Sequence, residues 1–106
     1  MSPKSVRARR AARRDIEEAV AYYADEAGEA VAHAFADAVA TALRLIGEHP
    51  GAGSPRYGQE LELPGLRSLV IPRFPYVAFY VERADHIELW RVLHAKRDIP
   101  AWLPEP

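Results

Sequence analysis

A single histidine near the end of the chain is the residue best suited to acid–base chemistry. His94 has an ordinary pKa of about 6.5, which suits a proton donor or a proton acceptor at neutral pH. The side chains that could assist it are Lys96, Arg97, Arg67, Arg73 and Tyr80. Such a set could support acid–base catalysis, which needs a base, an acid and positive charge to stabilise a negatively charged transition state. The structural alternative, which we favour, is that His94 ends a strand and orders the following segment through hydrogen bonds.

Two arginines inside strand-like runs, Arg67 and Arg91, suit binding better than catalysis. A guanidinium group forms bidentate pairs with carboxylates, so both could anchor acidic groups of a partner protein. The alternative is ordinary solvation, or pairing with acids of the same chain such as Glu82 or Glu88. We favour the binding role.

The tryptophans fall in different settings. Trp90 lies within a strand-like run and is expected to pack in the core or in an interface. Trp102 lies in the C-terminal segment 99–104, outside any strand, where it either folds back on the domain or belongs to a binding surface.

Metal and disulfide chemistry have little support in the sequence. The chain has no cysteine, which excludes disulfides and thiolate metal sites. Its histidines, which are His33, His49, His86 and His94, show no ligand-like spacing. No metal or other cofactor is expected.

Length and composition indicate one soluble domain spanning residues 1–106. A chain of 106 residues is near the common domain size, and 49% hydrophobic with 27% charged residues is ordinary for a globular protein. No apolar run approaches the roughly 20 residues of a membrane span, and the Arg-rich N-terminus has no apolar region of a secretory signal. A cytoplasmic location is the expectation.

The net charge of −1 conceals a strong asymmetry along the chain. The first 14 residues carry the basic side chains Lys4, Arg7, Arg9, Arg10, Arg13 and Arg14. Residues 15–48 are acidic, with Arg44 as their only arginine or lysine. A nucleic-acid binder usually has a basic excess over the whole domain, so this pattern favours a protein partner. The arginine cluster could bind nucleic acid, but solvation of a strand edge and pairing with Glu17 and Glu18 is the favoured interpretation.

The positions of apolar residues predict the elements that carry these side chains. Residues 5–9 alternate like a short strand, and residues 11–27 then show helical spacing. Gly28 breaks this helix, and a second, alanine-rich helix covers residues 29–47. Together they predict an antiparallel helical hairpin.

The second half of the chain reads as a loop followed by strands. The Pro and Gly content of residues 49–55 argues against regular structure there, and the loop extends to Pro64. Strand-like runs follow at residues 66–71, 76–82 and 87–93, separated by hairpin-sized connectors. The predicted order is β-α-α-β-β-β, with 76–82 beside 87–93 as a long central pair.

The last strands have apolar residues on both faces. Val77, Phe79 and Val81 alternate with Tyr76, Ala78 and Tyr80. In the final run, the face of Ile87 also carries Arg91, and the opposite face carries Trp90. Two explanations fit this pattern equally: a partner chain covers the second face, or a bulge in the final strand reverses its alternation.

Segments of this chain resemble the ParE family of type II toxins. Residues 64–69 contain a GLRSL motif, residues 76–80 read Y-x-x-F-Y, and residues 91–98 read R-V-L-H-x-x-R-D, in the order that the family shows after a helical hairpin. Residues 12–16 also look like the family's helix opening. The usual Ser/Thr-Pro helix entry is absent, because Arg10-Ala11 stands in its place.

The resemblance implies a fold and a set of partners. The implied fold is α+β, with a helical hairpin packed on an antiparallel sheet, as in the ribonuclease RelE. The implied partners are a ParD-like antitoxin, in a hetero-oligomer, and DNA gyrase as the poisoned target. No membrane partner and no specific nucleic-acid binding by the toxin alone are expected. The alternatives are a RelE-like mRNA endonuclease and an inactive member that acts only as a partner-binding co-repressor.

The candidate residues divide between these roles. For the antitoxin we expect contacts from the sheet, which are Arg67, Arg91, Tyr76, Tyr80 and Trp90. For the target we expect His94, Arg97 and Trp102. If the protein acts by binding its target, no catalytic residue is expected. The ribonuclease alternative would use His94, Lys96, Arg97 and Arg67. The absence of lysine from residues 48–64 weighs against that alternative, because RelE-type ribonucleases usually hold several basic residues before the sheet.

Overall fold

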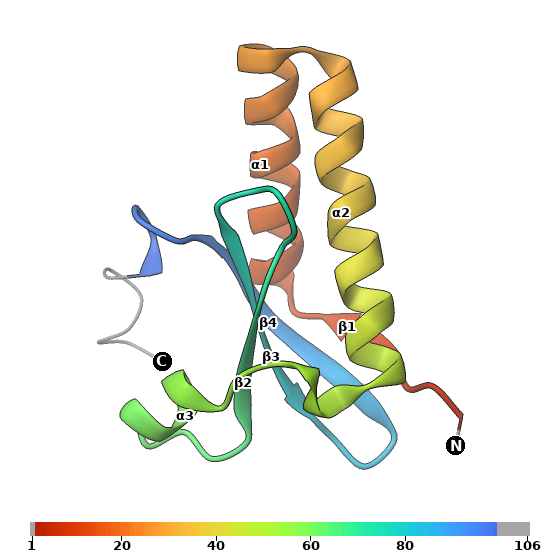
Figure 1. Ribbon diagram of the computed structural model, residues 1–106, viewed down its shortest axis with the longest axis vertical. Coiled ribbons are helices and arrows are strands. Elements are labelled where there is room, and N and C mark those ends of the chain that lie inside the picture. The colour runs from red at the N-terminus through yellow and green to blue at the C-terminus, as the bar shows by residue number, and fades with distance from the viewer. Residues whose placement is uncertain (1, 100–106) are drawn as a thin grey trace.

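The computed structural model describes residues 2–99 and shows a helical hairpin on a four-stranded sheet (Figure 1). In chain order the elements are β1 (Ser5–Ala8), α1 (Arg10–Ala27), α2 (Glu29–Glu48), the 3₁₀ turn η1 (Pro50–Ala52), α3 (Arg56–Glu60), β2 (Leu66–Val70), β3 (Tyr76–Glu82) and β4 (His86–His94). The hairpin rises well above the sheet, and α3 lies at the opposite end of the molecule. The predicted order β-α-α-β-β-β is confirmed.

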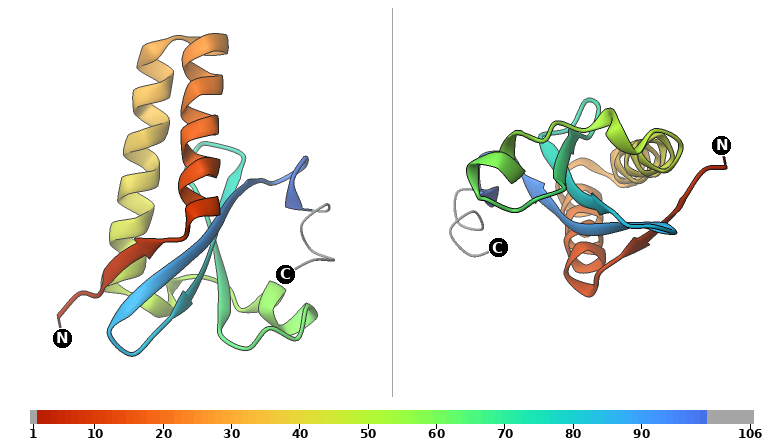
Figure 2. Two further views of the ribbon diagram at one scale, coloured as in Figure 1. Left: turned by 180° about the vertical axis from the view of Figure 1, so that it is seen from behind. Right: turned by 90° about the horizontal axis from the view of Figure 1, so that it is seen from below.

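The sheet has the order β1-β4-β3-β2, so the predicted central pair of β3 and β4 is confirmed. β2 and β4 both run antiparallel to β3. β1 joins the edge of β4 in parallel (Figure 2). In this pairing Ser5 lies opposite His86. The sheet is therefore mixed, and its first strand in the chain pairs with its last.

The helical hairpin follows from the spacing of its apolar residues. Ala12 and Ala19 of α1 are buried, and Ile16, Val20 and Tyr23 are packed against the same core. Phe35, Val39 and Ile46 of α2 face them. Gly28 separates the helices with φ of 94°, a left-handed backbone that residues with a side chain rarely adopt, which explains the break.

Both faces of the sheet are covered by the chain itself. Tyr76, Ala78 and Tyr80 of β3 pack beneath the helical hairpin. Val77, Phe79 and Val81 form a second cluster on the opposite face. The residues from the other segments that complete this second cluster are Leu66, Leu93, Ile99, Tyr57, Leu61, Leu63 and Trp90. A partner chain is therefore not required to explain the apolar residues on the second face.

A bulge in β4 explains its mixed alternation. The register with β3 shifts between Phe79, which pairs with Arg91, and Tyr80, which pairs with Leu89. Trp90 is the extra residue, so Leu89 and Val92 face the helical hairpin although an even spacing would require otherwise. The bulge interpretation is therefore correct.

The segment between α2 and β2 is more ordered than its composition predicts. It contains η1 and α3, where we expected an irregular loop. Gly58 permits this because a Cβ there would lie 2.5 Å from the Leu66 carbonyl oxygen. Close packing against β2, rather than local propensity, makes this segment the cover of the second face.

Helix α2 is long and apolar enough to cross a membrane by length and composition alone. This finding contradicts the expectation that no apolar run in the sequence approaches the length of a membrane span. Its buried residues, however, face α1 and the sheet, and Asp37 and Arg44 are exposed on its other side. Its apolar character is that of a core helix.

Candidate functional site

The turn that follows β4 is built around His94. The Nδ1 atom of His94 accepts hydrogen bonds from the backbone N–H groups of Lys96 (3.2 Å) and Arg97 (3.3 Å). The backbone N–H of His94 donates to the Asp98 carboxylate at 2.9 Å, and the Asp98 N–H donates back to the His94 carbonyl. The predicted structural role of His94 is confirmed.

This arrangement limits the chemistry of the imidazole. Burial, followed by the charge of Arg97, lowers the pKa of His94 and favours the neutral ring. With Nδ1 accepting hydrogen bonds, the neutral ring carries its proton on Nε2. Neither nitrogen then offers a free lone pair to act as a general base.

Arg67 and Tyr80 belong to a closed polar cluster at the other end of β3. The buried Tyr80 hydroxyl donates to the Pro50 carbonyl at 2.7 Å and accepts from the Gly53 N–H at 2.8 Å. The Arg67 guanidinium donates to the Gly53 carbonyl at 2.8 Å. Burial raises the pKa of Tyr80. Tyr80 is fully buried and offers a partner no surface, so its predicted antitoxin contact is wrong for this conformation.

The sheet register separates the ribonuclease candidates. His94 pairs with Tyr76, whereas Arg67 pairs with Tyr80, four positions further along β3. At about 3.3 Å per residue, this offset is about 13 Å along the strand. The structure therefore groups His94 with Lys96 and Arg97 but does not bring Arg67 to them.

Arg91 clamps α1 to β4. Its guanidinium makes a bidentate pair with the Asp15 carboxylate, with N···O distances of 2.7 and 2.9 Å. The same carboxylate accepts the Val92 N–H at 3.0 Å. Hydrogen bonding to Asp15 raises the pKa of Arg91. The alternative that Arg91 pairs with an acid of the same chain is therefore confirmed, although the acid is Asp15 and not Glu82 or Glu88. A contact of Arg91 with an antitoxin stays a prediction.

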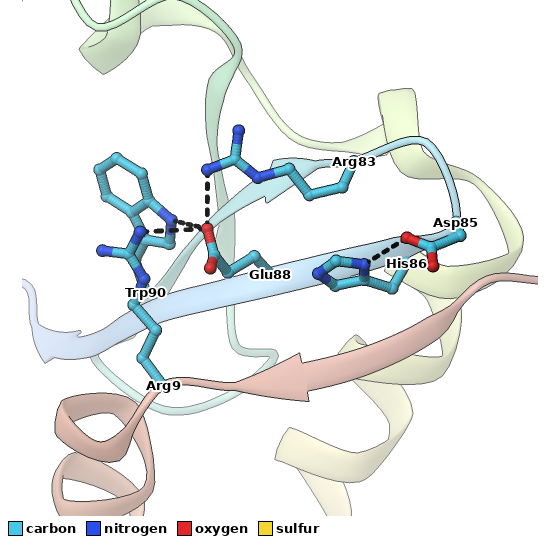
Figure 3. Close-up of polar contacts among 6 residues, drawn as sticks. All are labelled: Arg9, Arg83, Asp85, His86, Glu88 and Trp90. Atoms are coloured by element: carbon cyan, nitrogen blue, oxygen red, sulfur yellow. Dashed lines mark hydrogen bonds and ion pairs between the residues drawn. The ribbon is translucent and has the colours of Figure 1, made fainter.

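Glu88, on the outer side of β4, accepts hydrogen bonds from several neighbouring side chains (Figure 3). One of its carboxylate oxygens accepts hydrogen bonds from Arg83 (2.8 Å), Trp90 (2.9 Å) and Arg9 (3.1 Å). The hydrogen bonds from Arg83, Trp90 and Arg9 lower the pKa of Glu88 to about 2. Arg9 also lies over the Trp90 ring, 4.2 Å from its centroid. Trp90 is thus held by its neighbours in a partly buried position, as the packing prediction required.

The N-terminal basic cluster does not pair as expected. Lys4 binds Glu82 at 2.7 Å, and Arg9 binds Glu88. Within residues 2–99, no ion pair joins Arg10, Arg13 or Arg14 to Glu17 or Glu18. The expected pairing with Glu17 and Glu18 is therefore wrong, because the residues that flank β1 pair with the end of β3 and with β4 instead.

The candidate site is a groove between α1 and the turn after β4, with a volume of about 250 Å³. It is lined by Asp15, Glu18, Ala19, Tyr22, Tyr76, Val92, Arg97 and Asp98. The Arg97 guanidinium donates to the Tyr76 hydroxyl at 3.3 Å and lies 5.6 Å from the centroid of the Tyr22 ring. Burial raises the pKa of Tyr76. The predicted residues Tyr76 and Arg97 meet here.

Sequence reasoning missed Tyr22 and Glu18. Tyr22 is 48% exposed, one of the large hydrophobic side chains that the fold leaves in solvent. It lies beside Tyr23, which carries the apolar stripe of α1, and an aromatic residue outside that stripe was the available signal. Trp102 lies outside the described residues. Among residues 2–99, no group of three His, Asp or Glu side chains could hold a metal ion.

Comparison with known proteins identifies the family. A family model described as ParE toxin of type II toxin-antitoxin system, parDE, matches residues 6–99. A chain of the solved structure of the chromosomal ParDE TA system from P. aeruginosa has a similar fold, with a TM-score of 0.74 and 22% identity, over 88% of this chain and 97% of that chain. No curated protein matches. Because the family model covers most of the sequence, this chain belongs to the ParE toxin family of parDE type II toxin-antitoxin systems.

Proposed function

We propose that this ParE-family toxin acts by binding DNA gyrase rather than by catalysis, and that a ParD-like antitoxin neutralises it in a hetero-oligomer. The observation that carries the proposal is the state of His94, whose Nδ1 is occupied by two backbone N–H groups. Because its best acid–base residue is held by backbone hydrogen bonds, this toxin is better suited to act by binding through its surface. The proposal places the protein in the cytoplasm, where gyrase acts on DNA.

The ribonuclease alternative requires an arrangement that differs from the observed one. A phosphoryl-transfer site needs a base and several cations within reach of one phosphate. Lys96 and Arg97 are exposed near His94, but Arg67 is bound to Gly53 at the far end of β3. Arg56, in the segment before β2, is paired with Glu60. Binding is therefore the better supported mode of action.

The proposed target contacts are the exposed side chains around the turn after β4. Arg97 is exposed, and its guanidinium retains donors beyond the one directed at Tyr76. Arginine and tyrosine are common among the residues that dominate binding energy in protein interfaces. His94 contributes mainly by shaping this turn, and Trp102 follows it in the sequence.

Two assays on the purified toxin separate the modes of action. We expect inhibition of gyrase supercoiling, with intact mRNA in a translating extract. An Arg97→Ala variant should inhibit gyrase less, and Arg44→Ala, in a remote exposed position of α2, serves as the control. If mRNA is cleaved and His94→Ala abolishes the cleavage, the endonuclease replaces the gyrase binder.

The antitoxin part of the proposal has its own test. A short DNA-binding protein encoded in the adjacent reading frame should bind the toxin and restore gyrase activity. Binding without any effect of the toxin on gyrase or on mRNA would instead favour an inactive co-repressor. Failure of that protein to bind would remove the antitoxin from the proposal.

A further inference from the structure

We propose that the groove between α1 and the turn after β4 receives one cationic side chain, a lysine or an arginine, from the antitoxin. The inference rests on the proposed function only in requiring that an antitoxin binds this chain. A volume of about 250 Å³ is below the roughly 300–1,000 Å³ that is usual for small-molecule sites, and it suits a single side chain.

The charge of the groove favours a cation. Asp15, Glu18 and Asp98 contribute carboxylates to its lining. Arg91 neutralises Asp15 through the bidentate pair, but within residues 2–99 no ion pair engages Glu18 or Asp98. Asp98 uses one oxygen for the backbone N–H of His94. Arg91 and Arg97 offset part of this charge, and Glu18 and Asp98 keep carboxylate oxygens that no ion pair within residues 2–99 occupies.

The two tyrosines of the groove, Tyr22 and Tyr76, already contact a cation of the same chain. The Arg97 guanidinium lies over the Tyr22 ring and donates to the Tyr76 hydroxyl, so both groups can accept a guanidinium. Both contacts are weak, because 5.6 Å is near the limit of about 6 Å for a cation–π contact and 3.3 Å is a long hydrogen bond. An incoming cation that also reaches Glu18 can displace Arg97 at little cost, since Arg97 is exposed.

The antitoxin is the occupant that the family assignment favours, because a parDE system supplies the toxin with an antitoxin partner. An exposed tyrosine beside carboxylates is also a good anchor for a partner segment that folds on binding. Such a segment gains orientation from one well-placed charged side chain and covers the exposed half of the Tyr22 ring.

A double-mutant cycle tests the proposal with the protein of the adjacent reading frame as the probe. Each lysine and arginine of that protein is changed in turn to glutamine, and its Kd is measured by calorimetry against toxin variants. We expect Glu18→Gln to weaken binding roughly 3- to 5-fold and Tyr22→Leu roughly 5- to 10-fold. Tyr22→Phe keeps the ring and should bind nearly as well as the unmodified toxin. Glu17→Gln, an exposed neighbour outside the groove, is the matched control.

The expected pattern is that one antitoxin cation couples to both Glu18 and Tyr22, so that its loss removes the effect of either toxin change. Arg97→Ala should leave antitoxin binding unchanged or make it tighter, because the change frees Tyr22 and Tyr76 from their contacts with Arg97. If no cation couples to Glu18 and Tyr22, or if Arg97→Ala weakens binding as much as Tyr22→Leu does, the inference is overturned. Equal binding by all variants defeats only this inference, whereas no binding by the unmodified toxin defeats the proposed function.

Discussion

Two tyrosine–arginine pairs lie toward opposite ends of β3, and they differ in the exposure of the arginine and in the lengths of their contacts. Near one end, Tyr80 and Arg67 each make a 2.8 Å hydrogen bond with Gly53, and the buried Tyr80 hydroxyl also donates to the Pro50 carbonyl at 2.7 Å. At the other end, Arg97 reaches Tyr76 at 3.3 Å and Tyr22 at 5.6 Å, beside an open groove.

The difference shows how to separate folding residues from binding residues in this molecule. A buried polar group that lost its partner would cost its full desolvation energy, so the Tyr80 cluster is held tightly. The side chains around Arg97 can exchange their weak contacts for those of a partner, because water is close by. Residue type alone does not distinguish the two pairs, whereas the exposure of the arginine and the contact distances do.

The largest effect should come from Tyr80→Phe. The change leaves the Gly53 N–H and the Pro50 carbonyl without their partner, and we expect a loss of about 2–4 kcal/mol in the free energy of unfolding. Tyr76→Phe, the counterpart at the open end, should cost less than about 1 kcal/mol. Urea denaturation of both variants measures the difference. Equal losses would remove the distinction between the two ends.

Gly53→Ala should also destabilise the closed cluster, by about 1–3 kcal/mol. The added Cβ would lie 2.6 Å from the Tyr80 hydroxyl and 2.8 Å from the Ser68 carbonyl oxygen, so the cluster must shift. Gly51→Ala is the control, because nothing lies within 4 Å of its Cβ position. Thermal unfolding of the two variants decides, and a Gly53→Ala protein as stable as the control would show that the cluster is pliable.

Arg97→Ala should change stability by less than about 0.5 kcal/mol, the range of ordinary surface substitutions. Its expected effect is on function, with weaker inhibition of gyrase supercoiling. The paired measurement is chemical denaturation and supercoiling on the same preparation. A large loss of stability would place Arg97 with Arg67 as a folding residue.

The smallest effect should be a pH dependence of the free energy of unfolding that arises from His94, at the end of β4 beside the groove. Burial lowers the pKa of His94 in the folded state, so the unfolded chain binds the proton more readily. Stability should therefore fall as the pH drops below about 6.5, the ordinary histidine value. His94→Asn keeps a hydrogen-bond acceptor near Nδ1 without titrating. The difference between the unfolding free energies at pH 7.5 and pH 5 should be smaller for this variant than for the unmodified protein. If the two proteins show the same difference, His94 is not the source of the pH dependence.

Local patterns were sufficient to predict the helical hairpin and the strands. The bounds of β3 agree fully, and those of α1 and α2 agree within one residue, because their apolar spacing is regular and Gly28 marks the break. The parallel pairing of β1 with β4 has no local signal, since it joins residues that are distant in the chain. Helix α3 was not predicted because burial against β2, and not helix propensity, stabilises it.

The candidate site was only partly predictable for the same reason. The R-V-L-H-x-x-R-D motif placed His94 and Arg97 together, since they share one turn. The partner of Arg91 was not predictable, because Asp15 lies far away in the chain and several other acids were equally plausible. Tyr22 reaches the groove only through the packing of α1 against β4.

The pairing of β1 with β4 has a consequence for synthesis of the toxin. The N-terminal strand emerges from the ribosome first but has no neighbour in the sheet until residues 86–89 have been made. The nascent chain can form its helical hairpin early, yet the turn carrying Arg97 takes shape only after the last strand has emerged. Among the described elements, the groove beside Arg97 is therefore completed last during synthesis.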